Sequence, residues 1–93
     1  MKSLFVGAVS EKSCGAKRYA SGLPYSRFAV VVPNRECASV VARNRFRRTV
    51  YETIREKKLY DSPDRDVVLF FRGIKNLSNE NIAEIVIKII RRI

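Results

Sequence analysis

The sequence contains no histidine and only nine acidic residues, against 19 lysines and arginines in a chain of 93 residues. Without histidine, the chain can form neither a Ser-His or Cys-His nucleophile pair nor a Cys/His zinc site. Its two cysteines, Cys14 and Cys37, are too few for a disulfide scaffold, and we expect inert thiols. The apolar run from Leu4 to Val9 is far shorter than the ~20 residues of a membrane-spanning helix or the core of a signal peptide. We therefore expect a cytoplasmic protein.

The excess of basic over acidic residues gives the chain a net charge of +10. Such a charge on a small domain costs self-repulsion in the compact state and usually accompanies a polyanionic partner. RNA, DNA and an anionic membrane all satisfy this condition. Arginine outnumbers lysine by 12 to 7, and guanidinium groups pair bidentately with phosphate and stack on bases. The charge composition therefore favours a nucleic acid as the partner.

The chain shows no repeat, low-complexity tract or linker, and 46% of it is apolar, which predicts one domain over residues 1–93. Three runs rich in apolar and β-branched residues predict strands, from Leu4 to Val9, from Arg27 to Val32 and from Asp66 to Phe71. The polar stretch from Ser10 to Ser26 predicts a long loop with room for a hairpin.

Two segments have helical periodicity. The first runs from Ala38 to about Leu59, with Ser39 as its N-cap. Its apolar stripe, spaced at four residues, is Ala42, Phe46, Val50 and Ile54. The second runs from Asn79 to about Arg92 after the N-cap Ser78, and is mostly core. Its apolar positions are Ile82, Ile85, Val86, Ile87, Ile89, Ile90 and Ile93.

The predicted order of elements is strand, long loop, strand, helix, strand and helix. This order predicts a two-layer α/β sandwich of α+β type, in which a small mixed sheet carries both helices on one face. The strand-helix-strand crossover then contains the arginine-rich helix.

The most informative run is Ala-Arg-Asn-Arg-Phe-Arg-Arg, from Ala42 to Arg48. It places four arginines and an asparagine within two turns near a helix N-terminus, where the backbone amides and the helix dipole also favour anions. No acidic residue follows until Glu52, so the arginines would repel one another without a partner. A solvated charged face is the alternative, but the missing acids favour phosphate binding.

This run and the valine-rich strand before it resemble the protein subunit of bacterial ribonuclease P. That family has an apolar strand, a short basic loop, and a helix carrying Arg-Asn-Arg, a hydrophobe and a Lys/Arg-Arg pair. The resemblance covers about residues 27 to 92 and rests on Arg27 to Pro33 and Val40 to Arg48. It implies a subunit that binds the catalytic RNA and assists metal-dependent endonucleolytic removal of the 5′ leader of precursor tRNA. The RNA supplies the chemistry, so we expect no catalytic side chain and expect Mg²⁺ to be bound mainly by the RNA.

The resemblance further implies which residues bind RNA and which molecules are the partners. The expected RNA-binding residues are Arg35, Arg43, Asn44, Arg45, Arg47, Arg48 and Arg55. Asn44 has an alternative as a buried polar residue bonded to nearby backbone. The implied partners are ribonuclease P RNA and precursor tRNA, with no membrane and no required protein oligomer. The family's crossover is of the rare left-handed kind.

Leader recognition requires aromatic faces beside a positive groove. The candidates by position are Phe5, Tyr19, Tyr25 and Phe28. The alternative is that the two phenylalanines fill the core and the two tyrosines pack the loop. The sequence departs from the family in two ways. We expect this RNA-binding domain to lack the usual N-terminal helix, which forms one wall of the leader cleft. Tyr51 occupies a position where the family often has a further arginine.

Three other functions compete with this interpretation. A structural RNA-binding protein, similar to a small ribosomal protein and with no role in cleavage, is the main alternative. A metal-dependent nuclease acting alone is disfavoured because the nine acids show no clustered ligand pattern. A membrane-surface helix is disfavoured because a sheet already accounts for the narrow apolar stripe of the basic helix.

Overall fold

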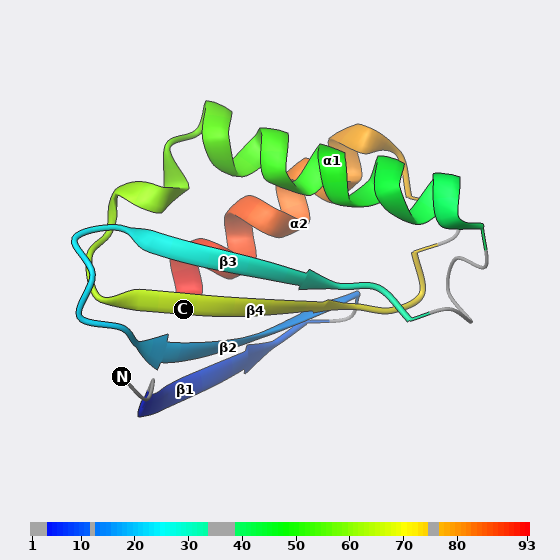
Figure 1. Ribbon diagram of the computed structural model, residues 1–93. Helices are drawn as coiled ribbons and strands as arrows, with labels where there is room; N and C mark the ends of the chain where they lie inside the picture. The colour runs from blue at the N-terminus through cyan, green and yellow to red at the C-terminus, as the bar shows by residue number, and fades with distance from the viewer. Residues whose placement is uncertain (1–3, 12, 34–38, 75–76) are drawn as a thin grey trace.

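The computed structural model describes residues 4–11, 13–33, 39–74 and 77–93, which form four strands, two α-helices and one 3-10 turn (Figure 1). In chain order these are β1 (Leu4–Ser10), β2 (Cys14–Ala20), β3 (Ser26–Val31), α1 (Val40–Glu56), η1 (Leu59–Asp61), β4 (Arg65–Phe71) and α2 (Asn79–Arg92). No helix among these residues is both long and apolar enough to span a membrane.

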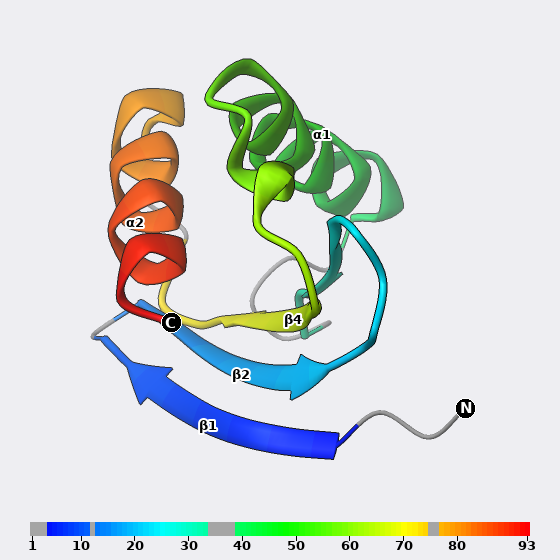
Figure 2. The same cartoon turned by 90° about the vertical axis from the view of Figure 1, so that its left-hand side faces the viewer.

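The four strands form one mixed sheet in the order β1-β2-β4-β3. The β1/β2 and β2/β4 pairs are antiparallel, and the β3/β4 pair is parallel. Both α-helices lie on the same face of the sheet, and no described element covers the opposite face (Figure 2). The predicted fold class, a mixed sheet with helices on one face, is confirmed.

The connection from β3 through α1 to β4 is left-handed. When the helices face the viewer and both strands point upward, β4 lies to the left of β3 (Figures 1 and 2). Parallel strand crossovers are right-handed in about 98% of cases. The crossover therefore has the rare hand that the family resemblance implied.

The stretch from Ser10 to Ser26 contains the predicted possibility of a hairpin, the turn between β1 and β2, but it is not a long loop, because its middle forms β2, a strand paired on both sides. The side chains of β2 do not follow the pattern that predicts a strand from sequence. Cys14 and Ala16 are small residues buried under the helices, and Arg18 extends beneath α2 to donate to the carbonyl oxygen of Ile93 at 3.0 Å. The outward positions are Gly15, Lys17 and Tyr19, so the strand lacks the apolar alternation that sequence patterns detect.

Both helices begin at the predicted caps. The Ser39 hydroxyl accepts from the Ala42 amide, and the Ser78 hydroxyl accepts from the Asn81 amide. The first helix is shorter than predicted: it ends at Glu56, and the following Lys58 has a left-handed φ of 52° that redirects the chain into η1.

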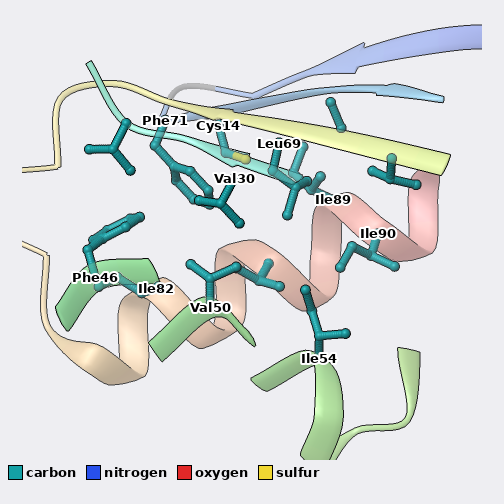
Figure 3. Close-up of a cluster of buried hydrophobic side chains, with 14 of the residues drawn as sticks. Cys14, Val30, Phe46, Val50, Ile54, Leu69, Phe71, Ile82, Ile89 and Ile90 are labelled. Atoms are coloured by element: carbon teal, nitrogen blue, oxygen red, sulfur yellow. The ribbon is translucent and has the colours of Figure 1, made fainter. Parts of the chain in front are cut away.

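The core lies between the helices and the sheet (Figure 3). Phe46, Val50 and Ile54 of α1 point into it, while the predicted fourth member, Ala42, is only half-buried. The rings of Phe46 and Phe71 meet edge to face with centroids 4.8 Å apart. From α2 the buried residues are Ile82, Val86, Ile89 and Ile90. The buried faces of both helices therefore fix which faces remain outward.

Candidate nucleic-acid interface

The face of α1 opposite the core carries three exposed arginines. Residues Asn44, Arg45, Arg48 and Arg55 are all exposed there, with Val41 at its N-terminal end. Val41, Asn44, Arg45 and Arg48 line a common shallow hollow. We call Asn44, Arg45, Arg48 and Arg55 the outer stripe. Its guanidinium groups can pair bidentately with phosphate oxygens without disturbing any buried contact.

The other predicted RNA-binding residues surround this stripe. Arg47 is exposed on the flank of α1 above β3, and Arg43 is half-buried near the helix start. The Asn44 side chain is exposed, so the alternative of a buried polar residue is wrong. Arg35 lies outside the described residues. Val40 and Val41 are 61% and 67% exposed at the N-terminal end of α1, which places an apolar patch beside the arginines.

The uncovered face of the sheet is a second candidate surface. Side chains alternate across a strand, so the outward residues of β4 are Asp66, Val68 and Phe70, between buried neighbours. Opposite them on β2, Lys17 pairs with Val68 and Tyr19 with Asp66. The Lys17 ammonium lies 5.5 Å from the centroid of the Phe70 ring. Aromatic, aliphatic and cationic groups thus share one open surface.

Two shallow hollows mark this face. One lies between β1, β2 and β4, where the small residues Ala8, Ser10 and Gly15 leave room beside Phe70 and Arg72. The Arg72 guanidinium is fixed there by the Ser10 hydroxyl at 3.0 Å and the Glu11 carbonyl at 2.7 Å.

The second hollow lies between Tyr19 on β2 and Ala29 on β3. Its floor includes Asp66, which accepts two hydrogen bonds from Arg27, at 2.8 Å from Nε and 2.6 Å from Nη2. The hydrogen bonds and the charge of Asp66 raise the pKa of the Arg27 guanidinium. Arg27 and Asp66 therefore form an ion pair on this face.

The four aromatic residues predicted for the leader separate into two groups. Phe5 is 59% exposed and meets Tyr19 edge to face with centroids 5.6 Å apart, so the structure brings these two together on the uncovered sheet face. Tyr25 is 47% exposed just before β3. Phe28 instead packs against the core, with the Arg65 guanidinium 5.8 Å from its ring centroid. The core alternative thus holds for Phe28 but is wrong for Phe5, and the loop alternative is wrong for Tyr19, which lies in β2.

Sequence reasoning placed Lys17 in a loop and missed Phe70 and Arg72 as members of this surface. The signal available was the pattern in the last strand, where Phe70 alternates with the buried Leu69 and Phe71. A sequence does not reveal which face of a sheet is left uncovered, because this depends on where distant helices pack.

Two inward arginines have a different role. Arg65 is 7% exposed and donates to the Ser26 hydroxyl at 3.0 Å, the Leu59 carbonyl at 2.8 Å and the Ile90 carbonyl at 3.4 Å. Burial first, and the charge of Arg18 second, lower the pKa of this guanidinium. Arg18 and Arg65 both donate to carbonyls at the C-terminal end of α2, where the helix dipole is negative. These arginines hold the fold together and are not available to a partner.

Across the described part of the chain, no three Asp, Glu or Cys side chains come together as potential metal ligands. Cys14 is fully buried, and its burial raises the pKa of the thiol to about 12. The described residues therefore contain no cluster of three such ligands, and the Cys14 thiol is not an accessible nucleophile. The arrangement is suited to binding phosphate and bases.

Comparison with known proteins identifies relatives. A family model described as Ribonuclease P matches residues 3–93. The ribonuclease P protein component of Aliivibrio fischeri is 31% identical over 74 residues. That match covers 78% of this chain and 62% of the relative, so the chain spans about three-fifths of the length of the curated relative that it matches.

Solved structures share the fold. The RNase P protein from Thermotoga maritima, in complex with 1-(4-fluorophenyl)-2-thiourea, superposes with a TM-score of 0.83 at 22% identity, over 94% of this chain and 85% of that one. The Staphylococcus aureus RNase P protein superposes with a TM-score of 0.73 at 19% identity, over 89% and 79% of the two chains. At these identities the likeness concerns the fold alone.

Proposed function

This chain belongs to the ribonuclease P protein family, and on that premise we propose that it is the protein subunit of ribonuclease P, acting with the catalytic RNA in the cytoplasm. In this proposal α1 binds ribonuclease P RNA, and the RNA performs the endonucleolytic cleavage that removes the 5′ leader of precursor tRNA. The observation that carries the proposal is the outer stripe, three exposed arginines and an asparagine on the helix face opposite the core. In the described part of the domain none of these four residues is buried.

The uncovered sheet face is the proposed site for the leader. Phe5, Tyr19 and Phe70 offer ring faces or edges, and Lys17 offers positive charge beside them, whereas the charge of Arg27 is paired with Asp66. Base stacking on aromatic side chains is worth ~1–3 kcal/mol per base and tolerates any sequence. A leader of variable sequence is suited to such a surface. Tyr25 lies at its rim, whereas Phe28 contributes to the core beneath it.

Magnesium belongs to the RNA in this proposal. The described residues bring no group of three potential ligands together, so this part of the chain offers no cage for the ion. The protein's own contribution is electrostatic: arginines that neutralise RNA phosphates lower the repulsion between the catalytic RNA and its substrate.

The decisive experiment adds the protein to a bacterial ribonuclease P RNA at low Mg²⁺ and measures cleavage of precursor tRNA. We expect stimulation by the intact chain. A double variant, Arg45→Ala with Arg48→Ala, should weaken binding to the RNA and reduce the salt slope of the affinity by about 1.4 to 1.8, which is 0.7 to 0.9 for each lost phosphate contact. Arg91→Ala is the matched control, because Arg91 is also exposed but lies on α2.

Each other outcome favours a different function. RNA binding without stimulation of cleavage at any salt concentration would support the structural RNA-binding alternative. An unchanged salt slope in the double variant would remove the outer stripe from the interface. Cleavage by the protein alone would support an independent nuclease.

A further inference from the structure

Tyr51 is an exposed aromatic residue of α1, the helix drawn above β3 in Figure 1. Tyr51 is 43% exposed, although its hydroxyl donates a hydrogen bond to the Phe28 carbonyl oxygen at 3.3 Å. Because β3 pairs only with β4 in the described sheet, this bond uses an acceptor on the free edge of the strand. The ring is thus tethered at its tip while much of it remains accessible to a partner.

The surroundings of this ring are positively charged. Arg47 and Arg55 precede and follow Tyr51 by four residues, about 6 Å along the helix axis in each direction, and both are exposed. The nearest acids on the helix, Glu52 and Glu56, project about 100° and 140° further round it. The cation–π contacts found among the described residues join Lys17 with Phe70 and Arg65 with Phe28, so neither neighbouring arginine covers the Tyr51 ring.

We propose that Tyr51 is a stacking platform for an unpaired RNA base, with Arg47 and Arg55 binding phosphates on either side of that nucleotide. This inference rests on the proposed function and extends it, because it assigns α1 a contact with a base as well as contacts with phosphates. Aromatic side chains next to cations are the combination that binds unpaired nucleotides. A tethered ring loses little conformational freedom on binding, which favours such a contact.

The charge of the flank supports a nucleotide over a second protein chain as the occupant. A protein surface would have to supply acids to both arginines, whereas one nucleotide with its neighbouring phosphates satisfies the ring and both cations together. The hydroxyl tether also predicts how the ring is presented, since it holds one edge against β3 and leaves a ring face toward solvent.

The chain contains no tryptophan, so a Tyr51→Trp variant carries a single reporter. We expect its fluorescence to be quenched when a bacterial ribonuclease P RNA is added, because the base stacks on the indole. Tyr60→Trp is the matched control: Tyr60 is 39% exposed in η1, beyond the end of α1, and its reporter should change little.

Affinity measurements separate stacking from charge. Tyr51→Ala should weaken binding about five- to 150-fold with an unchanged salt slope, whereas Tyr51→Phe, which loses only the hydroxyl, should bind nearly as well as the parent chain. Tyr51→Arg should steepen the slope by about 0.7 to 0.9, because it adds a phosphate contact. Urea unfolding of each variant identifies any that has lost its fold.

The results that overturn the proposal are distinct from those that overturn the proposed function. If the parent chain binds and Tyr51→Trp reports no quenching, Tyr51 only covers the edge of β3 and the proposal is wrong. The same conclusion follows if a folded Tyr51→Ala binds as tightly as the parent. If the parent chain itself does not bind the RNA, the proposed function fails.

Discussion

The buried thiol of Cys14 should make the stability of this protein fall at alkaline pH. The side chain is fully buried on β2, and its Sγ donates a hydrogen bond to the Gly15 carbonyl at 3.6 Å. Burial raises the pKa of the thiol from 9.0 to about 12, although the nearby charge of Arg72 acts in the opposite direction. The unfolded chain therefore loses this proton near pH 9, while the folded chain keeps it.

The sign and size of the effect follow from this difference. Stability is complete below about pH 9 and falls by about 1.4 kcal/mol for each pH unit as the pH rises toward 12. At about pH 10.5 the loss is about 2 kcal/mol, a substantial part of the 5 to 14 kcal/mol expected for a domain of this size.

Urea unfolding of the parent chain and of Cys14→Ala, at about pH 8 and about pH 10.5, tests this prediction. The variant should be less stable at the lower pH because it loses buried contacts. Its stability should nevertheless fall less between the two pH values, by about 2 kcal/mol. Every other ionisable group is the same in both proteins, so the comparison isolates Cys14. An equal fall in both proteins would refute the reasoning.

Two further predictions concern side chains that form hydrogen bonds between distant segments of the fold. Arg65→Met keeps the aliphatic stem but loses the hydrogen bonds to Ser26, Leu59 and Ile90. It should destabilise the protein by ~1–3 kcal/mol in thermal unfolding. An equal or higher Tm would show that burying the charge costs as much as the hydrogen bonds contribute. Asp64 accepts from the Ser21 and Gly22 amides, at 2.9 and 2.5 Å, so Asp64→Ala should cost ~1–2 kcal/mol in urea unfolding. Asp64→Asn is its control, because asparagine keeps an acceptor and tolerates the φ of 58°, and equal losses in the two variants would contradict this role.

The parts of the fold that depend on neighbouring residues could be predicted from the sequence. Ser39 and Ser78 cap their helices as expected, because an N-cap bond joins residues only three apart. The apolar stripe with Phe46 and Val50 also identified the buried face of α1, and so its outward arginines.

The parts that depend on distant residues could not be predicted. β2 is a strand because β1 and β4 pair with it on either side, and its own composition resembles a loop. Arg65 is buried because three oxygen atoms from β3, η1 and α2 meet its guanidinium, and the sequence alone shows only one more arginine. The uncovered sheet face has the same origin, since both helices pack on the other side.

Two pairs of arginines in this chain therefore have opposite requirements. Arg18 and Arg65 face inward and satisfy carbonyl oxygens at the end of α2, whose dipole replaces the carboxylate that a buried cation usually needs. Arg45 and Arg48 face outward and are exposed, and the first acid after them on the helix is Glu52. Removing the inward group should lower stability, whereas removing the outward group should relieve repulsion and weaken only RNA binding. A protein whose net charge served solubility alone would show neither half of this separation, because exposed charges would then be interchangeable.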